Sequence, residues 1–190
     1  MMSFLEAISP TARTLLNGDR PDRSVKNSPV MMDVIMGVMD LIEKSNDRIA
    51  AVDFDLDLKL AWLTGRVGDI AKTMGERRQQ AVAHAAGAAF AWLLAMKLPE
   101  TDVVARIADE RLRQRQLFAA RKLTFRVDSK AVGDWRKLRA LVEELGEVAE
   151  AVDQLEAHPR SRQHRAHMLG ELVQVAAVCV AWLESYEVPS

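Results

Sequence analysis

The chain has 190 residues, of which 49% are hydrophobic and 28% charged, and its formal net charge is -1. This is the composition of an ordinary globular protein, and the near-neutral balance gives no reason to expect nucleic acid or an anionic membrane as a partner. The most apolar run, residues 81–96, is short for a membrane span, and the single Cys179 excludes an internal disulfide. We therefore expect a cytoplasmic protein in which Cys179 is a buried core residue.

Apolar residues recur at the helical period along most of the chain, while strand-like alternation is scarce. After a polar arm over residues 1–28, which opens with a short helix near 4–8, this pattern predicts six main helices. They are expected over residues 31–49, 53–75, 76–97, 101–122, 134–157 and from 161 onward, with proline and glycine mostly at their ends. The predicted fold class is an all-α helical bundle of about six main helices.

Polar residues at the predicted helix starts are suited to capping. Asp53, Asp55 and Asp57 alternate as in a metal-binding loop, but capping and first-turn charge explain them better. The N-caps expected for the last three helices are Thr101 or Asp102, then Asp134, then Ser161.

The two halves of the chain resemble each other. Residues 63–71 align with residues 141–149, so that Gly68 meets Gly146 and Asp69 meets Glu147, and residues 91–93 match residues 181–183. We therefore expect a polar N-terminal arm (1–28), a degenerate helical half (29–100) and a second half with the acidic motif (101–190). The positions of the first half that match the acidic motif carry Gly65, Arg66, Ala81 and His84.

The acidic motif has two parts on the last two predicted helices. Glu144 and Glu147 are three residues apart on one helix, and Glu171 and Gln174 are three residues apart on the next, so each pair shares a helix face. An antiparallel hairpin would bring the four side chains together, and a hard cation with oxygen ligands, such as Mg²⁺, would relieve the repulsion between the carboxylates. A solvated acidic surface is the alternative. Against it, Gly146 costs helix stability, which indicates that another backbone or a ligand comes close.

This arrangement resembles the MazG-like all-α nucleoside triphosphate pyrophosphohydrolases, whose pattern is E-x-x-E on one helix and E-x-x-D on the next. Residues 143–147 (EELGE) and 171–174 (ELVQ) carry the resemblance, and residues 108–116 (ADERLRQRQ) are similar to the opening helix of phage and actinobacterial members. The similarity covers roughly residues 104–186. One departure is Gln174, which stands where the family usually has aspartate.

The resemblance implies cleavage of a nucleoside triphosphate between the α- and β-phosphates, giving a monophosphate and pyrophosphate. It implies that Mg²⁺, or Mn²⁺ in its place, is held by Glu144, Glu147, Glu171 and Gln174. Glu143, or alternatively Glu150, would orient or deprotonate the attacking water. It assigns no further substrate-binding residue. MazG-like chains generally build their four-helix unit from more than one subunit, and here an intact and a degenerate half could form that unit within one chain. Two such chains could then associate through leftover apolar helix faces, and we expect a homodimer.

Several features stay open at the level of sequence. The basic stretch from Arg106 to Arg126 could meet triphosphate oxygens or be a solvated helix face, and Trp135 could stack on a base or belong to the core. The histidines His158, His164 and His167 are better explained as surface residues than as a zinc site. Two further functions compete with the enzyme: a helical interaction protein that has lost activity, and a sensor that binds a nucleotide without turnover.

Overall fold

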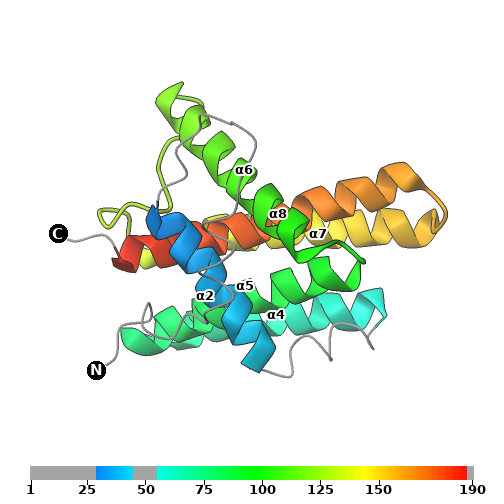
Figure 1. Cartoon of the computed structure of the whole chain (residues 1–190), viewed down its shortest axis with the longest axis horizontal. Helices are drawn as coiled ribbons and strands as arrows, with labels where there is room; N and C mark the ends of the chain where they lie inside the picture. Colours follow the sequence, from blue (N-terminus) through cyan, green and yellow to red (C-terminus); the bar gives the residue numbers. More distant parts are fainter. Residues whose placement is uncertain (1–28, 45–54, 188–190) are drawn as a thin grey trace.

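The computed structural model describes residues 29–44 and 55–187, and these residues form six α-helices and no strand (Figure 1). The all-α fold predicted from the sequence is confirmed. The polar arm and its expected short helix lie outside the described residues. The helices are α2 (Pro29–Lys44), α4 (Leu56–Lys72), α5 (Glu76–Ala95), α6 (Glu100–Ala119), α7 (Asp134–Ala157) and α8 (Arg162–Glu187).

Two helical hairpins and two crossing helices make up the bundle. In Figure 1, α4 and α5 form one hairpin and α7 and α8 form the other, and α5 packs against α8 to join them. α2 lies across α5 and α8, while α6 crosses α8 on another side. The α7–α8 hairpin therefore has α6 beside it, and this arrangement defines the site described below.

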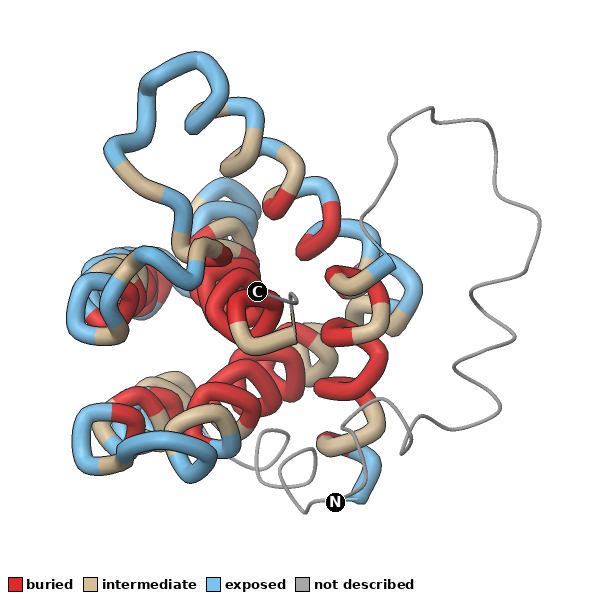
Figure 2. Tube along the Cα trace, turned by 90° about the vertical axis from the view of Figure 1, so that its left-hand side faces the viewer, coloured by how far each residue is buried: buried red, intermediate tan, exposed pale blue. Residues whose placement is uncertain are grey.

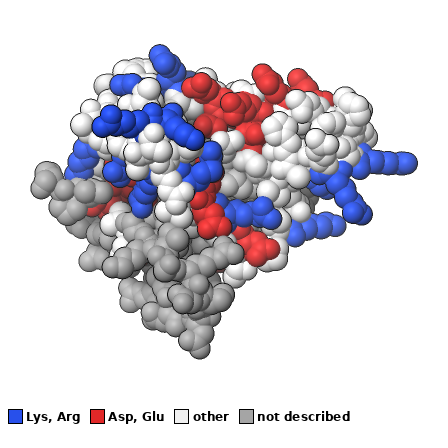
Figure 3. All heavy atoms as spheres, turned by 90° about the horizontal axis from the view of Figure 1, so that it is seen from above, with Lys and Arg blue, Asp and Glu red and all other residues white. Residues whose placement is uncertain are grey.

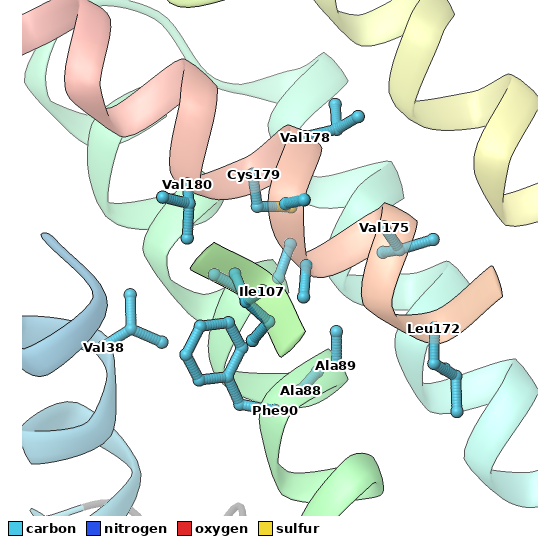
Figure 4. Close-up of a cluster of buried hydrophobic side chains, with 14 of the residues drawn as sticks. Val38, Ala88, Ala89, Phe90, Ile107, Leu172, Val175, Val178, Cys179 and Val180 are labelled. Carbon is cyan, nitrogen blue, oxygen red and sulfur yellow. The ribbon is translucent and has the colours of Figure 1, made fainter. Parts of the chain in front are cut away.

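The core lies along α5 and α8, which are buried over most of their length (Figure 2). Alanines such as Ala88 and Ala89 on α5 let α8 approach closely, and larger side chains from α2 and α6 fill the space around them (Figure 4). By length and composition α8 could cross a membrane, but 67% of its apolar window is buried inside this fold. A helix that is apolar all round is expected at the centre of a bundle.

Cys179 lies in this core, as expected, and burial raises the pKa of its thiol to about 12. Trp92 and Trp182 are also fully buried.

The predicted helix caps are confirmed at two positions and wrong at two. Asp55 accepts a hydrogen bond from the Leu58 amide at 2.8 Å, and the Ser161 hydroxyl accepts one from the His164 amide at 3.2 Å. Thr101 and Asp102 are not caps, because α6 begins at Glu100 directly after Pro99. Asp134 is not a cap either, because it is the first residue of α7 and Gly133 holds the N-cap position. Its carboxylate instead accepts a hydrogen bond from Arg78 at 2.6 Å.

Three helices end earlier than the sequence pattern predicts. α4 ends at Lys72, α5 at Ala95 and α6 at Ala119, whereas the predicted ends were residues 75, 97 and 122. Lys97 and Arg121 adopt left-handed backbone conformations, with φ of 64° and 57°. A left-handed residue cannot continue a right-handed helix, so the chain turns at these points.

Candidate active site

Three glutamates on the α7–α8 hairpin converge on one point. Glu144 and Glu147 on α7 and Glu171 on α8 each offer one carboxylate oxygen, and these three oxygens lie within 4.8 Å of one another. Within the described part of the chain, no other set of three or more His, Cys, Asp or Glu side chains is arranged in this way. The convergence of these residues that the spacing predicted is therefore present in the structure.

The carboxyl group of Glu144 is poorly satisfied in this cluster. Its Oε2 atom is buried and has no hydrogen-bond partner among the described residues. Burial, followed by the negative charges of Glu147, Glu171, Glu110 and Glu143, raises the pKa of Glu144 to about 7. A bound cation or a proton would satisfy this oxygen. Mg²⁺ binds oxygen ligands such as the three that converge here.

Glu171 is 9% exposed and is held from both sides by side chains of its own helix. Burial and the neighbouring Glu147 raise its pKa. The amide nitrogen of Gln174 donates a hydrogen bond to Glu171 Oε2, and His167 Nδ1 lies 3.1 Å from Glu171 Oε1. These contacts fix the orientation of the carboxylate, as second-layer groups do around many metal ligands.

Gln174 therefore has a different place in the structure from the metal ligand implied by the resemblance. Its side-chain oxygen accepts a hydrogen bond from Arg113 at 3.2 Å, while its nitrogen faces Glu171. A role as a metal ligand would require the amide to rotate and break both contacts. In the observed arrangement Gln174 links Glu171 to α6.

Arg113 and Glu110 extend the cluster onto α6. Arg113 donates two hydrogen bonds to Glu110, at 2.6 and 2.7 Å, and its pKa is raised mainly by this pairing. Gln114 donates a further hydrogen bond to Glu110 at 3.2 Å. The sequence singled out Arg113 only as part of a basic stretch, since nothing local shows that it reaches α8.

A cavity of about 350 Å³ opens beside the glutamates, between α6, residues 120–133, α7 and α8. Glu143, Glu144 and Glu147 form its acidic wall, whereas Glu150 does not line it. Six arginines also line the cavity: Arg111, Arg113, Arg115, Arg126, Arg136 and Arg139. Figure 3, viewed from above, shows acidic side chains gathered together on this face, with Lys and Arg side chains to either side.

Part of the basic wall is held by a buried ionic network. Arg111 pairs with Asp128 at 3.1 Å and with Glu184 at 2.7 Å, Arg115 pairs with Glu184 at 3.1 Å, and Arg126 pairs with Asp128 at 2.8 Å. The two carboxylates are almost fully buried. The network ties residues 120–133 to α6 and α8, so these arginines have a structural role that the sequence did not reveal.

Three other expectations are answered by their surroundings. Trp135 is 67% exposed, so the core interpretation is wrong; it does not line the cavity, and stacking on a base stays a prediction. His158 and His164 contact each other edge to face, with ring centroids 4.8 Å apart, and no metal-binding group includes them. Nothing in the described chain lies within 4 Å of a Cβ placed on Gly146, so no close backbone there explains this glycine.

The sequence matches no protein-family model, no curated protein and no solved structure.

Proposed function

We propose that this protein is a Mg²⁺-dependent nucleoside triphosphate pyrophosphohydrolase that cleaves a (d)NTP into a (d)NMP and pyrophosphate. The observation that carries the proposal is the meeting of Glu144, Glu147 and Glu171 within 4.8 Å, at the edge of a cavity that is also lined by arginines. Carboxylates suit the cation and arginines suit the phosphates. The short MazG-like motifs support the same reaction.

The three glutamates are the residues that would hold Mg²⁺, or Mn²⁺ in its place. The buried, unpaired Oε2 atom of Glu144 supports this assignment, because a bound cation would satisfy it. When bound, the ion would polarise the phosphate and neutralise charge on the leaving pyrophosphate. Gln174 and His167 would keep Glu171 in a single orientation.

Glu143 is the residue that we assign to the attacking water. It lines the cavity beside Glu144 and is exposed to it, whereas Glu150, the other possibility, lies outside the lining. Glu143 accepts a proton from water as the water oxygen forms a bond to the α-phosphorus. The bond from that phosphorus to the bridging oxygen breaks, and pyrophosphate leaves.

A nucleotide sensor without turnover is the second candidate, and the position of Gln174 favours it. With its oxygen on Arg113, Gln174 leaves three protein ligands at the cluster where the MazG-like pattern has four. Such a protein would bind a Mg²⁺–nucleotide complex without splitting it. The helical interaction protein is the remaining alternative, and it predicts no response to Mg²⁺ or nucleotide.

The deciding experiment is a pyrophosphate-release assay over the common ribo- and deoxyribonucleoside triphosphates, with Mg²⁺ or Mn²⁺. We expect release from wild type and none from Glu147→Ala, because this substitution removes a metal ligand. Glu156→Ala is the matched control, since Glu156 is an exposed glutamate of the same helix outside the cavity. Binding of nucleotide without release would indicate the sensor. Equal thermal stabilisation by Mg²⁺ in wild type and Glu147→Ala would exclude the metal site.

A further inference from the structure

The six arginines of the cavity differ in how they are neutralised. Arg111, Arg113, Arg115 and Arg126 are each paired with a carboxylate at 3.1 Å or less. Arg136 and Arg139, both on α7, have no ion pair with any residue that the structure describes, although both are exposed and line the cavity. These two guanidinium groups are the ones available to an anionic ligand.

Arg139 lies on the same helix as the acidic wall, four residues before Glu143 and five before Glu144. At about 1.5 Å of rise per residue, its Cα is displaced from theirs by roughly 6 to 7.5 Å along the axis of α7. Arg136 lies about one further turn away. Along the cavity toward the N-terminus of α7, the carboxylates therefore come first and the two unpaired arginines follow. This spacing is comparable with the length of a polyphosphate chain that begins at the carboxylates.

Arg136 is oriented without being neutralised. Its guanidinium carbon lies 4.4 Å from the centroid of the Phe125 ring. The ring attracts the guanidinium but carries no net charge that would neutralise it. A planar fork with free donors is suited to binding two phosphate oxygens at once.

We propose that Arg139 and Arg136 bind the β- and γ-phosphates, the half of the substrate that leaves as pyrophosphate. This inference rests on the proposed function, and it assigns the substrate-binding residues that the sequence left open. The nucleoside then lies on the other side of the glutamates from these arginines. The site selects substrates by the length of their phosphate chain, because a nucleoside monophosphate cannot reach Arg139 while its α-phosphate lies at the glutamates.

The test uses inorganic pyrophosphate as the probe, titrated calorimetrically into the full chain in the presence of Mg²⁺. We expect Arg139→Gln to weaken pyrophosphate binding about tenfold or more, as for the loss of a charged hydrogen bond. Thermal stabilisation by Mg²⁺ alone should not change. Arg165→Gln is the matched control, because Arg165 is an exposed helical arginine outside the cavity and should bind pyrophosphate as wild type does.

The outcomes separate this inference from the function on which it rests. Pyrophosphate binding that depends on Arg139, in a protein that releases none from any triphosphate, supports the anion site and contradicts the enzyme. A second outcome is that wild type hydrolyses a triphosphate while the Arg136→Gln/Arg139→Gln double variant binds pyrophosphate as tightly as wild type does. That result overturns the arginine site but retains the proposed enzymatic function. A wild type that binds no pyrophosphate also overturns the site.

Discussion

Glu144 destabilises the metal-free protein when it is ionised. Its pKa is raised from the ordinary 4.5 to about 7, mainly by burial and then by the surrounding carboxylates. Between these pH values the folded state holds a proton that the unfolded state has lost. The free energy of unfolding therefore falls as the pH rises from about 4.5 to 7, and stays lower above that range.

Glu144→Gln should remove this effect. In the presence of a chelator, we expect the variant to unfold at a higher temperature than wild type at pH 8 and to show no such gain at pH 3.5, where Glu144 is largely protonated in both states. Thermal unfolding at the two pH values measures the difference, with Glu156→Gln as the control for a surface glutamate. A gain of the same size at both pH values would contradict the raised pKa.

A second prediction at the residue scale concerns a substitution of Gln174. Gln174→Asp places a fourth carboxylate near the cluster, and it removes the hydrogen bond that Glu171 accepts from the amide. We expect Mg²⁺ to bind more tightly and turnover to change, while the metal-free variant becomes less stable because like charges gather without a cation. Thermal shifts with and without Mg²⁺, together with pyrophosphate release, test this expectation. A Mg²⁺ response identical to that of wild type would show that position 174 has no influence on the metal.

The glutamates could be predicted from sequence because their arrangement is local to each helix. Glu144 and Glu147 share a face through their spacing, and a hairpin with a short connection brings Glu171 opposite them. Asp128 and Glu184 could not be predicted in the same way, since they meet Arg111 across 17 and 73 residues. The orientation of the Gln174 amide also depends on such a contact, with Arg113 on another helix.

At the scale of elements, Asp128 holds the segment between α6 and α7 in place. Burial opposes the ionisation of this carboxyl, but hydrogen bonds from Arg126 and the charges of Arg111 and Arg115 outweigh it, and the pKa of Asp128 is lowered. The stabilisation is therefore present above the ordinary pKa of aspartate and is lost as the pH falls through the lower, folded-state value.

Asp128→Ala should lower the free energy of unfolding by about 3–5 kcal/mol at pH 7, because Glu184 alone is then left in the network to balance the charges of three arginines. Denaturant unfolding measures the change. Asp153→Ala, at an exposed position of α7, should change it by less than about 0.5 kcal/mol. If both variants unfold alike, the network contributes no net stability.

At the scale of the whole molecule, the two helical hairpins occupy corresponding places in the bundle. The α4–α5 hairpin packs on the α7–α8 hairpin, and each has a crossing helix, α2 or α6, against its inner member. We propose that this arrangement reflects an internal repeat with one intact and one degenerate half. The positions of Gly65, Arg66, Ala81 and His84 supply no carboxylate, so the proposal gives one metal site per chain.

Boundaries of the elements were predictable only within a few residues. The helical period identified the described helices, but the apolar repeat of α7 includes Val142, which is 51% exposed. The early ends of α5 and α6 were not foreseeable, because the left-handed conformations of Lys97 and Arg121 occur in residues with no preference for them. The start of α6 at Glu100 shows that a proline can precede a helix without any side-chain cap.

The outer face of α7 indicates how two chains would associate. Trp135 and Val142 lie two turns apart on one stripe, are 67% and 51% exposed, and are followed one turn later by Gly146. Nothing in the described chain covers Gly146, and a helix tolerates the cost of a glycine where a second backbone packs against it. We therefore expect a homodimer in which this stripe faces its copy in the second chain, with Arg139 at the edge of the contact, on the side of the stripe toward the cavity.

Trp135→Glu should then convert the dimer into a monomer, because it places a charge in an apolar contact. Light scattering at micromolar concentrations measures the mass of each species. Leu58→Glu changes a similarly exposed apolar residue on α4 and should leave the dimer intact. A monomeric wild type would exclude the dimer, and a dimer that survives Trp135→Glu would move the interface to another face. Neither result would alter the metal site, since its three glutamates belong to a single chain.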